Sequence, residues 1–283
     1  EKEGIAHIAH AVNADDLIVA GSTDTIAVNI TAQSGSGGKV NINGAFSLIG
    51  GDRQTGARIA SGPNTAITAD NIVLDAGNAT DLVNLSGGIT SGANKGFGAS
   101  VSINEMDRTA RALIGDTSDA PATGGSVTAA ENMALSAQNT GLMGGFSLAA
   151  AKQAKTDTTG DTGTTAKDTG KGKAGIGMSG DVSINQVTDT TESIISDGVS
   201  VQAGGSESAT LGVDLDHDGS DDFSRELDAG LAMDAHNPTQ MMVFGGAVTI
   251  SKSESTGIAG TFSYNTVNKT TGVLVATSDV TID

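Results

Sequence analysis

The most specific chemical motif in this 283-residue chain is the acidic stretch DLDHDGSDD, residues 214–222. Its oxygen-bearing residues fall at positions 1, 3, 5, 7 and 9 of a calcium-loop pattern: Asp214, Asp216, Asp218, Ser220 and Asp222. Ca²⁺ is held by several oxygen ligands at about 2.3–2.6 Å, and a glycine at position 6, here Gly219, permits the sharp turn that makes alternate ligands converge. The motif predicts a Ca²⁺ site in which Ser220 contributes its backbone carbonyl. The alternative is a solvated acidic loop that binds no ion.

Position 12 of the same pattern is Arg225, where an EF-hand carries a bidentate glutamate. The stretch is therefore an incomplete EF-hand, and it is similar instead to the short D-x-D-x-D-G-x-x-D loops of extracellular bacterial repeats. Two histidines, His7 and His10, have a spacing that a metal could use, but no carboxylate lies next to them. We expect these two side chains to have a strand-edge or packing role.

Two Asp–Arg dipeptides, Asp52-Arg53 and Asp107-Arg108, stand at equivalent positions of an internal repeat. Hydrolysis of a glycosidic bond needs two carboxyl groups held about 5–9.5 Å apart, and parallel β-helices do host polysaccharide-degrading enzymes. Recurrence within a repeat favours a structural role, as a surface Asp–Arg pair that supports a turn. We therefore predict no catalytic residue and no enzyme, with a polysaccharide-degrading β-helix enzyme as the alternative.

The composition excludes several kinds of partner and site. The chain has 33 acidic and 15 basic residues and a net charge of −18, so it lacks the clustered Lys and Arg that bind nucleic acids. It has no apolar run of about 18 residues, and we expect no membrane insertion. It has no cysteine and therefore no disulfide or thiolate site. With 40 Gly, 6 Phe, one Tyr and no Trp, its interior is expected to be filled by thin layers of Ile, Val, Leu and Ala.

The elements that carry these residues are repeated. One nine-residue phrase occurs four times: NINGAFSLI (41–49), GFGASVSIN (96–104), GMSGDVSIN (177–185) and GIAGTFSYN (257–265). Once two polar insertions at about 152–173 and 204–228 are subtracted, the repeat is about 55 residues long. A repeat of this kind predicts stacked structural units in which each unit covers the next.

Within the phrase, apolar residues alternate with serine, and a period of two indicates a β-strand with one buried face. A second apolar strand segment follows ten residues later in each unit. The predicted core columns contain Ile103, Ile184, Ile114 and Ile195, and the predicted outward residues are Ser102 and Ser183.

Short strands separated by Gly, Asn, Asp and Ser favour a parallel β-solenoid over an array of β-sandwiches, which run about 100 residues per domain around aromatic cores. If one coil takes on the order of 20 residues, each unit comprises two to three coils. We expect a single solenoid segment over 1–283, interrupted by the two insertions. The chain begins with EKEG, without an initiator Met or a signal peptide, and SDVTID at its end starts another unit. We therefore expect a piece of a longer protein with uncovered terminal strands.

Three stretches carry a family resemblance: GFGASVSINEMDRTARALIGD (96–116), GDVSINQVTDTTESIISDG (180–198) and GTFSYNTVNKTTGVLVATSD (260–279). They resemble the repeat regions of large bacterial filamentous surface adhesins, of the filamentous-haemagglutinin-like and leukotoxin-type filamentous kinds. The first unit departs from this pattern, with Ile49 where the others have Asn. The resemblance implies an all-β fold, a right-handed parallel β-helix (β-solenoid) with inserted polar loops, exported to the bacterial cell surface.

The function predicted on these grounds is that of a structural and adhesive stalk segment in a secreted, filamentous surface fibre of the type found in biofilms. Its expected partners are neighbouring repeats of the same chain. A receptor on a host cell, on a neighbouring cell or in the matrix is a further possible partner. Lateral or end-to-end self-association is also possible. The further alternative is a sheath or matrix protein that assembles into filaments. The only cofactor expected is Ca²⁺.

Overall fold

The computed structural model describes residues 2–37, 40–92, 95–116, 124–153, 175–213, 223–251, 256–277 and 279–282. These residues form strands and short connections, and no helix occurs among them. The described part of the chain accordingly has no helix long and apolar enough to cross a membrane. The fold is an all-β parallel solenoid, as predicted, with two long sheets and one short sheet.

The first long sheet, which we call the return sheet, is made of parallel strands in the order β1-β4-β7-β11-β17. These strands are β1 (Lys2–Ile8), β4 (Val40–Ile59), β7 (Lys95–Ile114), β11 (Ile176–Ile195) and β17 (Thr256–Val275). The last four are each 20 residues long and pair without a slip over their whole length.

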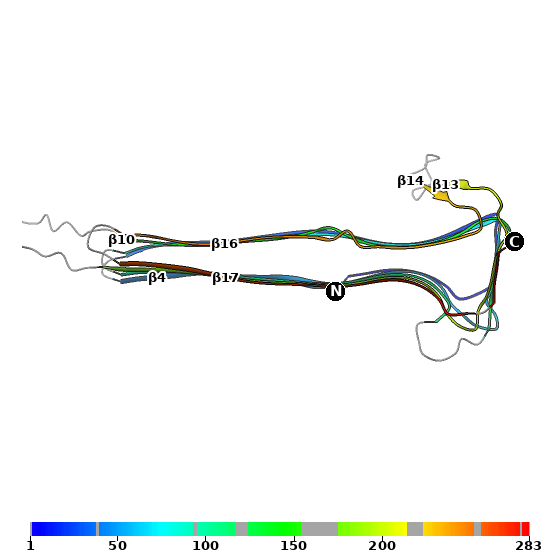
Figure 1. Cartoon of the computed structure of the whole chain (residues 1–283), viewed down its shortest axis with the longest axis horizontal. Helices are drawn as coiled ribbons and strands as arrows, with labels where there is room; N and C mark the ends of the chain where they lie inside the picture. Colours follow the sequence, from blue (N-terminus) through cyan, green and yellow to red (C-terminus); the bar gives the residue numbers. More distant parts are fainter. Residues whose placement is uncertain are drawn as a thin grey trace, which may run out of the picture.

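The second long sheet, the outbound sheet, faces the first. It contains β3 (Asp16–Gly37), β6 (Asn71–Gly92), the collinear β9 (Met133–Thr140) and β10 (Leu142–Gln153), and the collinear β15 (Leu231–His236) and β16 (Gln240–Ile250). All of its pairings are parallel. Figure 1 shows the two long sheets as two layers that run side by side and join at one end.

A short parallel sheet, the base sheet, closes that end (Figure 1). Its strands are β2 (Val12–Asn13), β5 (Ala66–Ala69), β8 (Ser126–Ala129), β12 (Ser200–Ala203) and β18 (Val280–Ile282). In each coil the chain crosses the base sheet, runs out along the outbound sheet and comes back along the return sheet.

One sequence unit is therefore one coil, and the expectation of two to three coils per unit is wrong. Asn71 bonds to Asp16, 55 residues earlier, on the preceding coil. Asn104, Asn185 and Asn265 stack on three successive coils at intervals of 81 and 80 residues. The coil is long because its two main strands have about 20 residues each, where a compact β-helix uses short strands.

The base contains the apolar core that the composition predicts. Ile59, Ile114 and Ile195 are fully buried in adjacent strands, in register with one another. They pack with aliphatic residues of the base and outbound sheets, including Ile67, Ile72, Leu74, Val127, Leu135 and Val201. The predicted core positions Ile114 and Ile195 are confirmed.

The rest of the two long sheets has the opposite arrangement. We call this part the arm; it comprises 83–92 and 95–105 together with their register partners. Ser102 and Ser183 are completely buried there, while Ile103 and Ile184 are only partly buried. The predicted orientation of these strands is therefore wrong: serine faces the partner sheet and isoleucine faces outward.

The reason is the close approach of the two sheets in the arm. A Cβ atom on Gly88 would lie 2.5 Å from the carbonyl oxygen of Ala99 on the opposite sheet, and one on Gly98 would lie 2.6 Å from that of Ala150. Real Cβ atoms do not come this close to a backbone oxygen. Glycines and small polar side chains fit between the sheets, and a row of isoleucines does not.

The second insertion includes an antiparallel hairpin, β13 (Ala209–Val213) and β14 (Phe223–Leu227), which lies beside the base in Figure 1. Leu211 and Leu227 pack there on Val73 and Ala134 of the outbound sheet. This insertion is thus in part an ordered element that covers the solenoid. The first insertion falls largely in 154–174, outside the described residues.

Candidate functional site: the arm and its outer faces

A ladder of asparagine side chains runs through the arm interior from coil to coil. Asn84 donates to Asn104 Oδ1 at 2.6 Å, Asn104 donates to Asn185 Oδ1, and Asn185 donates to Asn265 Oδ1 at 2.8 Å. Ser47 caps one end by donating to Asn84. Every rung is buried or partly buried, so the amides satisfy one another in place of water. The ladder specifies coil register, because a slip by one residue would leave these groups unpaired.

The ladder fits because the facing position on the outbound sheet is glycine. A Cβ on Gly145 would lie 2.4 Å from Asn185 Oδ1 and 2.8 Å from Asn104 Nδ2. The interior also contains a direct bond between the sheets, since the hydroxyls of Ser86 and Ser100 are 2.7 Å apart. The interior of the arm is thus a polar seam held by side-chain hydrogen bonds.

One carboxylate lies in this seam. Asp181 is 2 % exposed, and its Oδ2 accepts hydrogen bonds from Ser147 at 2.7 Å and from Thr261 at 3.2 Å. Burial raises the pKa of Asp181, and the hydrogen bonds from Ser147 and Thr261 offset part of that rise. Its Oδ1 is buried with no hydrogen-bond partner among the described residues. A neutral Asp181 side chain suits this environment better than a charged one.

A column of charged side chains crosses the inside where the arm meets the base. The register places Arg53, Arg108, Asp189 and Lys269 on successive strands. Arg108 donates to both carboxylate oxygens of Asp189, at 2.8 and 2.7 Å, and both side chains are completely buried. Lys269 donates to the carbonyl oxygens of Asn237 and Thr239, at 3.1 and 2.9 Å.

The buried charge of Arg53, the first residue of the column, is less well compensated by hydrogen bonds than that of Arg108. Arg53 is 8 % exposed and donates through Nη1 to the carbonyl oxygen of Gly51 at 2.9 Å. Burial lowers the pKa of the Arg53 guanidinium, and the charge of Arg108 lowers it further, against an opposing effect of Asp52. Outside the sheet, burial raises the pKa of Asp107, and the neighbouring charges of Asp52, Asp189 and Glu105 add to that rise.

The outer surface of the return sheet within the arm is apolar; we call it the return face. Its outward residues form four columns across β4, β7, β11 and β17: Ile42, Phe97, Met178 and Ile258; Gly44, Ala99, Gly180 and Gly260; Phe46, Val101, Val182 and Phe262; Leu48, Ile103, Ile184 and Tyr264. Phe46 and Phe262 are 59 % and 57 % exposed. Lys95 borders the face at the end of the arm away from the base, and Glu105 borders it at the end next to the base.

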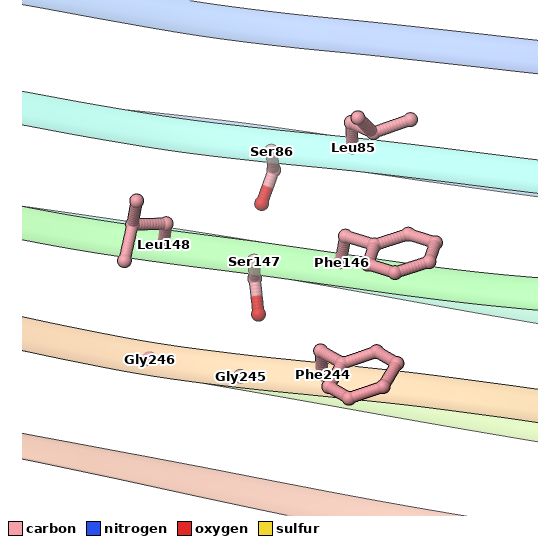
Figure 2. A pocket seen from close by; sticks show the side chains of 8 residues that line it. All are labelled: Leu85, Ser86, Phe146, Ser147, Leu148, Phe244, Gly245 and Gly246. Atoms are coloured by element: carbon pink, nitrogen blue, oxygen red, sulfur yellow. The ribbon is translucent and has the colours of Figure 1, made fainter.

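The outer surface of the outbound sheet within the arm, the outbound face, is apolar as well. Ile30, Leu85, Phe146 and Phe244 lie in register on adjacent strands, and the rings of Phe146 and Phe244 stack with centroids 5.5 Å apart. Figure 2 shows Leu85, Phe146 and Phe244 side by side next to Gly245 and Gly246. A shallow hollow of about 350 Å³ lies over these residues, Ser86, Ser147 and Leu148.

The five predicted Ca²⁺ ligands lie outside the described residues: Asp214, Asp216, Asp218, Ser220 and Asp222. The strands on either side of this stretch, β13 and β14, pair with each other, and Val213 lies opposite Phe223. The described residues contain no cluster of three or more His, Asp or Glu side chains suited to a metal. His7 lies on the exposed edge strand β1.

The interpretation of Asp107-Arg108 as a surface ion pair is wrong. Arg108 points inward and pairs with Asp189 on the next coil, whereas Asp107 points outward. Sequence reasoning singled out neither Asp189 nor Asp181. The signal for Asp189 was present, because aligning the units places a negative residue opposite Arg108 in the same column. No comparable signal marks Asp181.

Comparison with models of known protein families, with curated proteins and with solved structures finds no match to this chain.

Proposed function

We propose that this chain is a stalk segment of a large exported bacterial surface fibre. The observation that supports this most is the register of the return sheet, where four 20-residue strands pair in parallel without a slip. Their backbone hydrogen bonds all point along one axis, and the asparagine ladder and the Arg108–Asp189 pair add side-chain links along the same axis. Such an arrangement resists bending and stretching along the stack.

The position of the variable elements supports the same proposal. The hairpin β13–β14 is inserted between the base and outbound sheets and leaves the coil register on either side unchanged. A stack that tolerates insertions at its periphery can display loops at regular intervals while its axis stays intact. We propose that the adhesive contacts of the fibre, with cells or matrix, are made by such loops, and that the loop at 214–222 binds Ca²⁺.

The experiment that tests the proposal uses antibodies raised against the purified chain. Labelling of intact source cells, removed by brief external proteolysis, is the expected result for a surface fibre. Electron microscopy of shed material should then show thin filaments that carry the label. Labelling that appears only after lysis would overturn the export and fibre assignment. Release of reducing sugars or unsaturated products from acidic polysaccharides by the purified chain would favour the enzymatic alternative.

A further inference from the structure

We propose that the return face is a self-complementary interface, on which a second copy of this chain packs face to face with its strands antiparallel to the first. The starting observation is that large apolar side chains cover the face while the inside of the same strands is polar. A contiguous exposed apolar patch of this kind marks an interaction surface. The pattern within the patch identifies what fits it.

The two middle columns of the face, one of small and one of large side chains, complement each other about a single centre. A two-fold axis parallel to the solenoid axis, placed between the second and third columns, sets Ala99 of one copy opposite Val101 of the other. The same operation sets Phe97 opposite Ile103. Across the other coils it brings the small column Gly44, Gly180 and Gly260 against the large column Phe46, Val182 and Phe262. A ridge of one copy therefore faces a groove of the other, twice per interface.

The charges at the borders of the face select the same register. Lys95 and Glu105 lie on β7 at equal distances from the proposed axis, so each Lys95 stands opposite the Glu105 of the other copy. Parallel strands would require the stacking direction of one copy to be reversed, so β7 would face β11 of the other copy. Lys95 and Glu105 would then stand opposite Ile176 and Gln186 and not opposite each other. Two independent features, the fit of large against small columns and the pairing of opposite charges, thus point to one antiparallel arrangement.

The small size of the face favours a weak contact. Four strands about 4.8 Å apart, with seven residues that each rise about 3.3 Å, cover about 440 Å² per copy, or about 900 Å² in both copies together. Stable specific interfaces bury about 1,200–2,000 Å², and most lattice contacts bury less than about 800 Å². This chain should therefore form a weak, concentration-dependent dimer. Each additional coil on both copies would add about 220 Å² in the same register.

The symmetry has a structural consequence. Because the two-fold axis is parallel to the stacking axis, the two solenoids point in the same direction and coil pairs with coil. Two fibres made of such coils would pair along their whole length through their return faces. Their outbound faces would remain exposed on the outside of the paired fibre. Dimerisation of the purified chain does not depend on where the protein is located in the cell.

The test is sedimentation velocity over a range of protein concentrations, at physiological ionic strength to screen the repulsion between chains of net charge −18. A Cβ added at Gly260 or at Gly272, both on β17, would meet nothing within 4 Å, so both positions accept a side chain in the single molecule. Gly260→Val fills the groove and Gly272→Val lies outside the face. We expect Gly260→Val to raise the dimer dissociation constant about tenfold or more, and Gly272→Val to leave it unchanged.

This pair of variants distinguishes a specific interface from non-specific hydrophobic association. Both add the same apolar bulk to the surface, so non-specific hydrophobic association would increase equally in both. Stronger or unchanged dimerisation of Gly260→Val would overturn the proposal. The melting temperature of each variant, measured on monomer at low concentration, shows whether the fold is retained. If Gly260→Val is unfolded, Gly180→Val provides the same test, because a Cβ there also meets nothing within 4 Å.

Charge exchange tests the register. Lys95→Glu and Glu105→Lys should each weaken the dimer, and the double variant should restore it, because only the antiparallel arrangement sets these two positions opposite each other. Failure of the double variant to recover would contradict the register. The chain has no cysteine, so Lys95→Cys combined with Glu105→Cys permits cross-linking by a short bismaleimide. The two positions are too far apart along one strand to be linked within a copy, and either single cysteine should cross-link poorly.

Lipid is the competing occupant of an apolar face, and flotation with neutral phosphatidylcholine vesicles distinguishes it. The dimer proposal predicts no flotation of the chain, and Gly260→Val should not change that result. If the chain floats with vesicles and remains monomeric at all concentrations without them, the face binds acyl chains and the dimer proposal is wrong.

Discussion

Arg108 and Asp189 form a buried, bidentate ion pair between adjacent coils, with Nε–Oδ1 and Nη2–Oδ2 distances of 2.8 and 2.7 Å and no solvent exposure. The hydroxyl of Thr239 also donates to Asp189 Oδ2 at 2.8 Å. Next to the pair lies a small apolar cluster of Leu82, Met106, Met143 and Val187. The pair therefore lies in a closed, dehydrated layer that separates the apolar base from the polar arm.

Removing one partner of this pair should be strongly destabilising. Asp189→Ala leaves the Arg108 guanidinium buried without its counter-charge, a situation that typically costs about 3–5 kcal/mol. Replacing both residues, as Arg108→Met with Asp189→Leu, should recover most of the loss, because the adjoining cluster is apolar. Chemical denaturation monitored by circular dichroism measures both effects. A double variant no more stable than Asp189→Ala would show that the pair contributes more than mutual neutralisation.

The inverted arm makes a prediction about two neighbouring residues. Ser102→Leu inserts a large side chain between closely packed sheets and should cost about 1–3 kcal/mol or more. Ile103→Ser changes an outward position and should cost less than about 1 kcal/mol in the monomer. Unfolding at low protein concentration provides the comparison. The reverse ranking would mean that isoleucine, and not serine, faces the interior.

Asp181 should make stability depend on pH. Its pKa is raised in the folded protein, so the folded state binds more protons than the unfolded state between the unfolded pKa of about 3.9 and the higher folded pKa. The contribution is complete below that pKa and is lost as pH rises through the folded pKa. Asp181→Asn should therefore be more stable than wild type at neutral pH, with the difference vanishing in acid. A difference that is independent of pH between 3 and 7 would contradict this assignment.

Edge strands should exchange amide hydrogens faster than central ones. Among the described strands, β17 lies at the edge of the return sheet and pairs with β11 alone, whereas β11 pairs on both sides. Hydrogen exchange followed by mass spectrometry should show slow exchange in Ile176–Ile195 and much faster exchange in Thr256–Val275. Equal protection of both strands in a monomeric sample would indicate that another segment covers β17.

The acidic loop at 214–222 should bind one Ca²⁺ ion. Five oxygen-bearing residues at alternate positions motivate this expectation, and the paired strands β13 and β14 hold the ends of the loop together. Isothermal titration should detect one site that Asp216→Ala weakens strongly, with Asp228→Ala as a control outside the loop. No heat up to millimolar Ca²⁺ would mean that the loop binds no ion.

The sequence alone determined the repeat, the strands and their register. The four phrases that end at Ile49, Asn104, Asn185 and Asn265 pair residue by residue in the structure, as their alignment predicts. The register could be predicted because similar units that stack in parallel place their equivalent residues side by side. The alternation of residue types likewise defined the two sides of each strand, since side chains alternate with a period of two.

Only the tertiary structure decided which of those two sides is the interior. The alternation around Ser102 and Ile103 is the same whether serine or isoleucine points inward, and hydrophobicity alone favours isoleucine. The outcome depends on the distance between two sheets, and that distance is set by glycines such as Gly88 and Gly98 against backbone oxygens on the other sheet. The same holds for Arg108, whose partner Asp189 lies 81 residues away. A local pattern specifies what alternates along a strand, whereas the clearance to a facing strand is a property of the assembled coil.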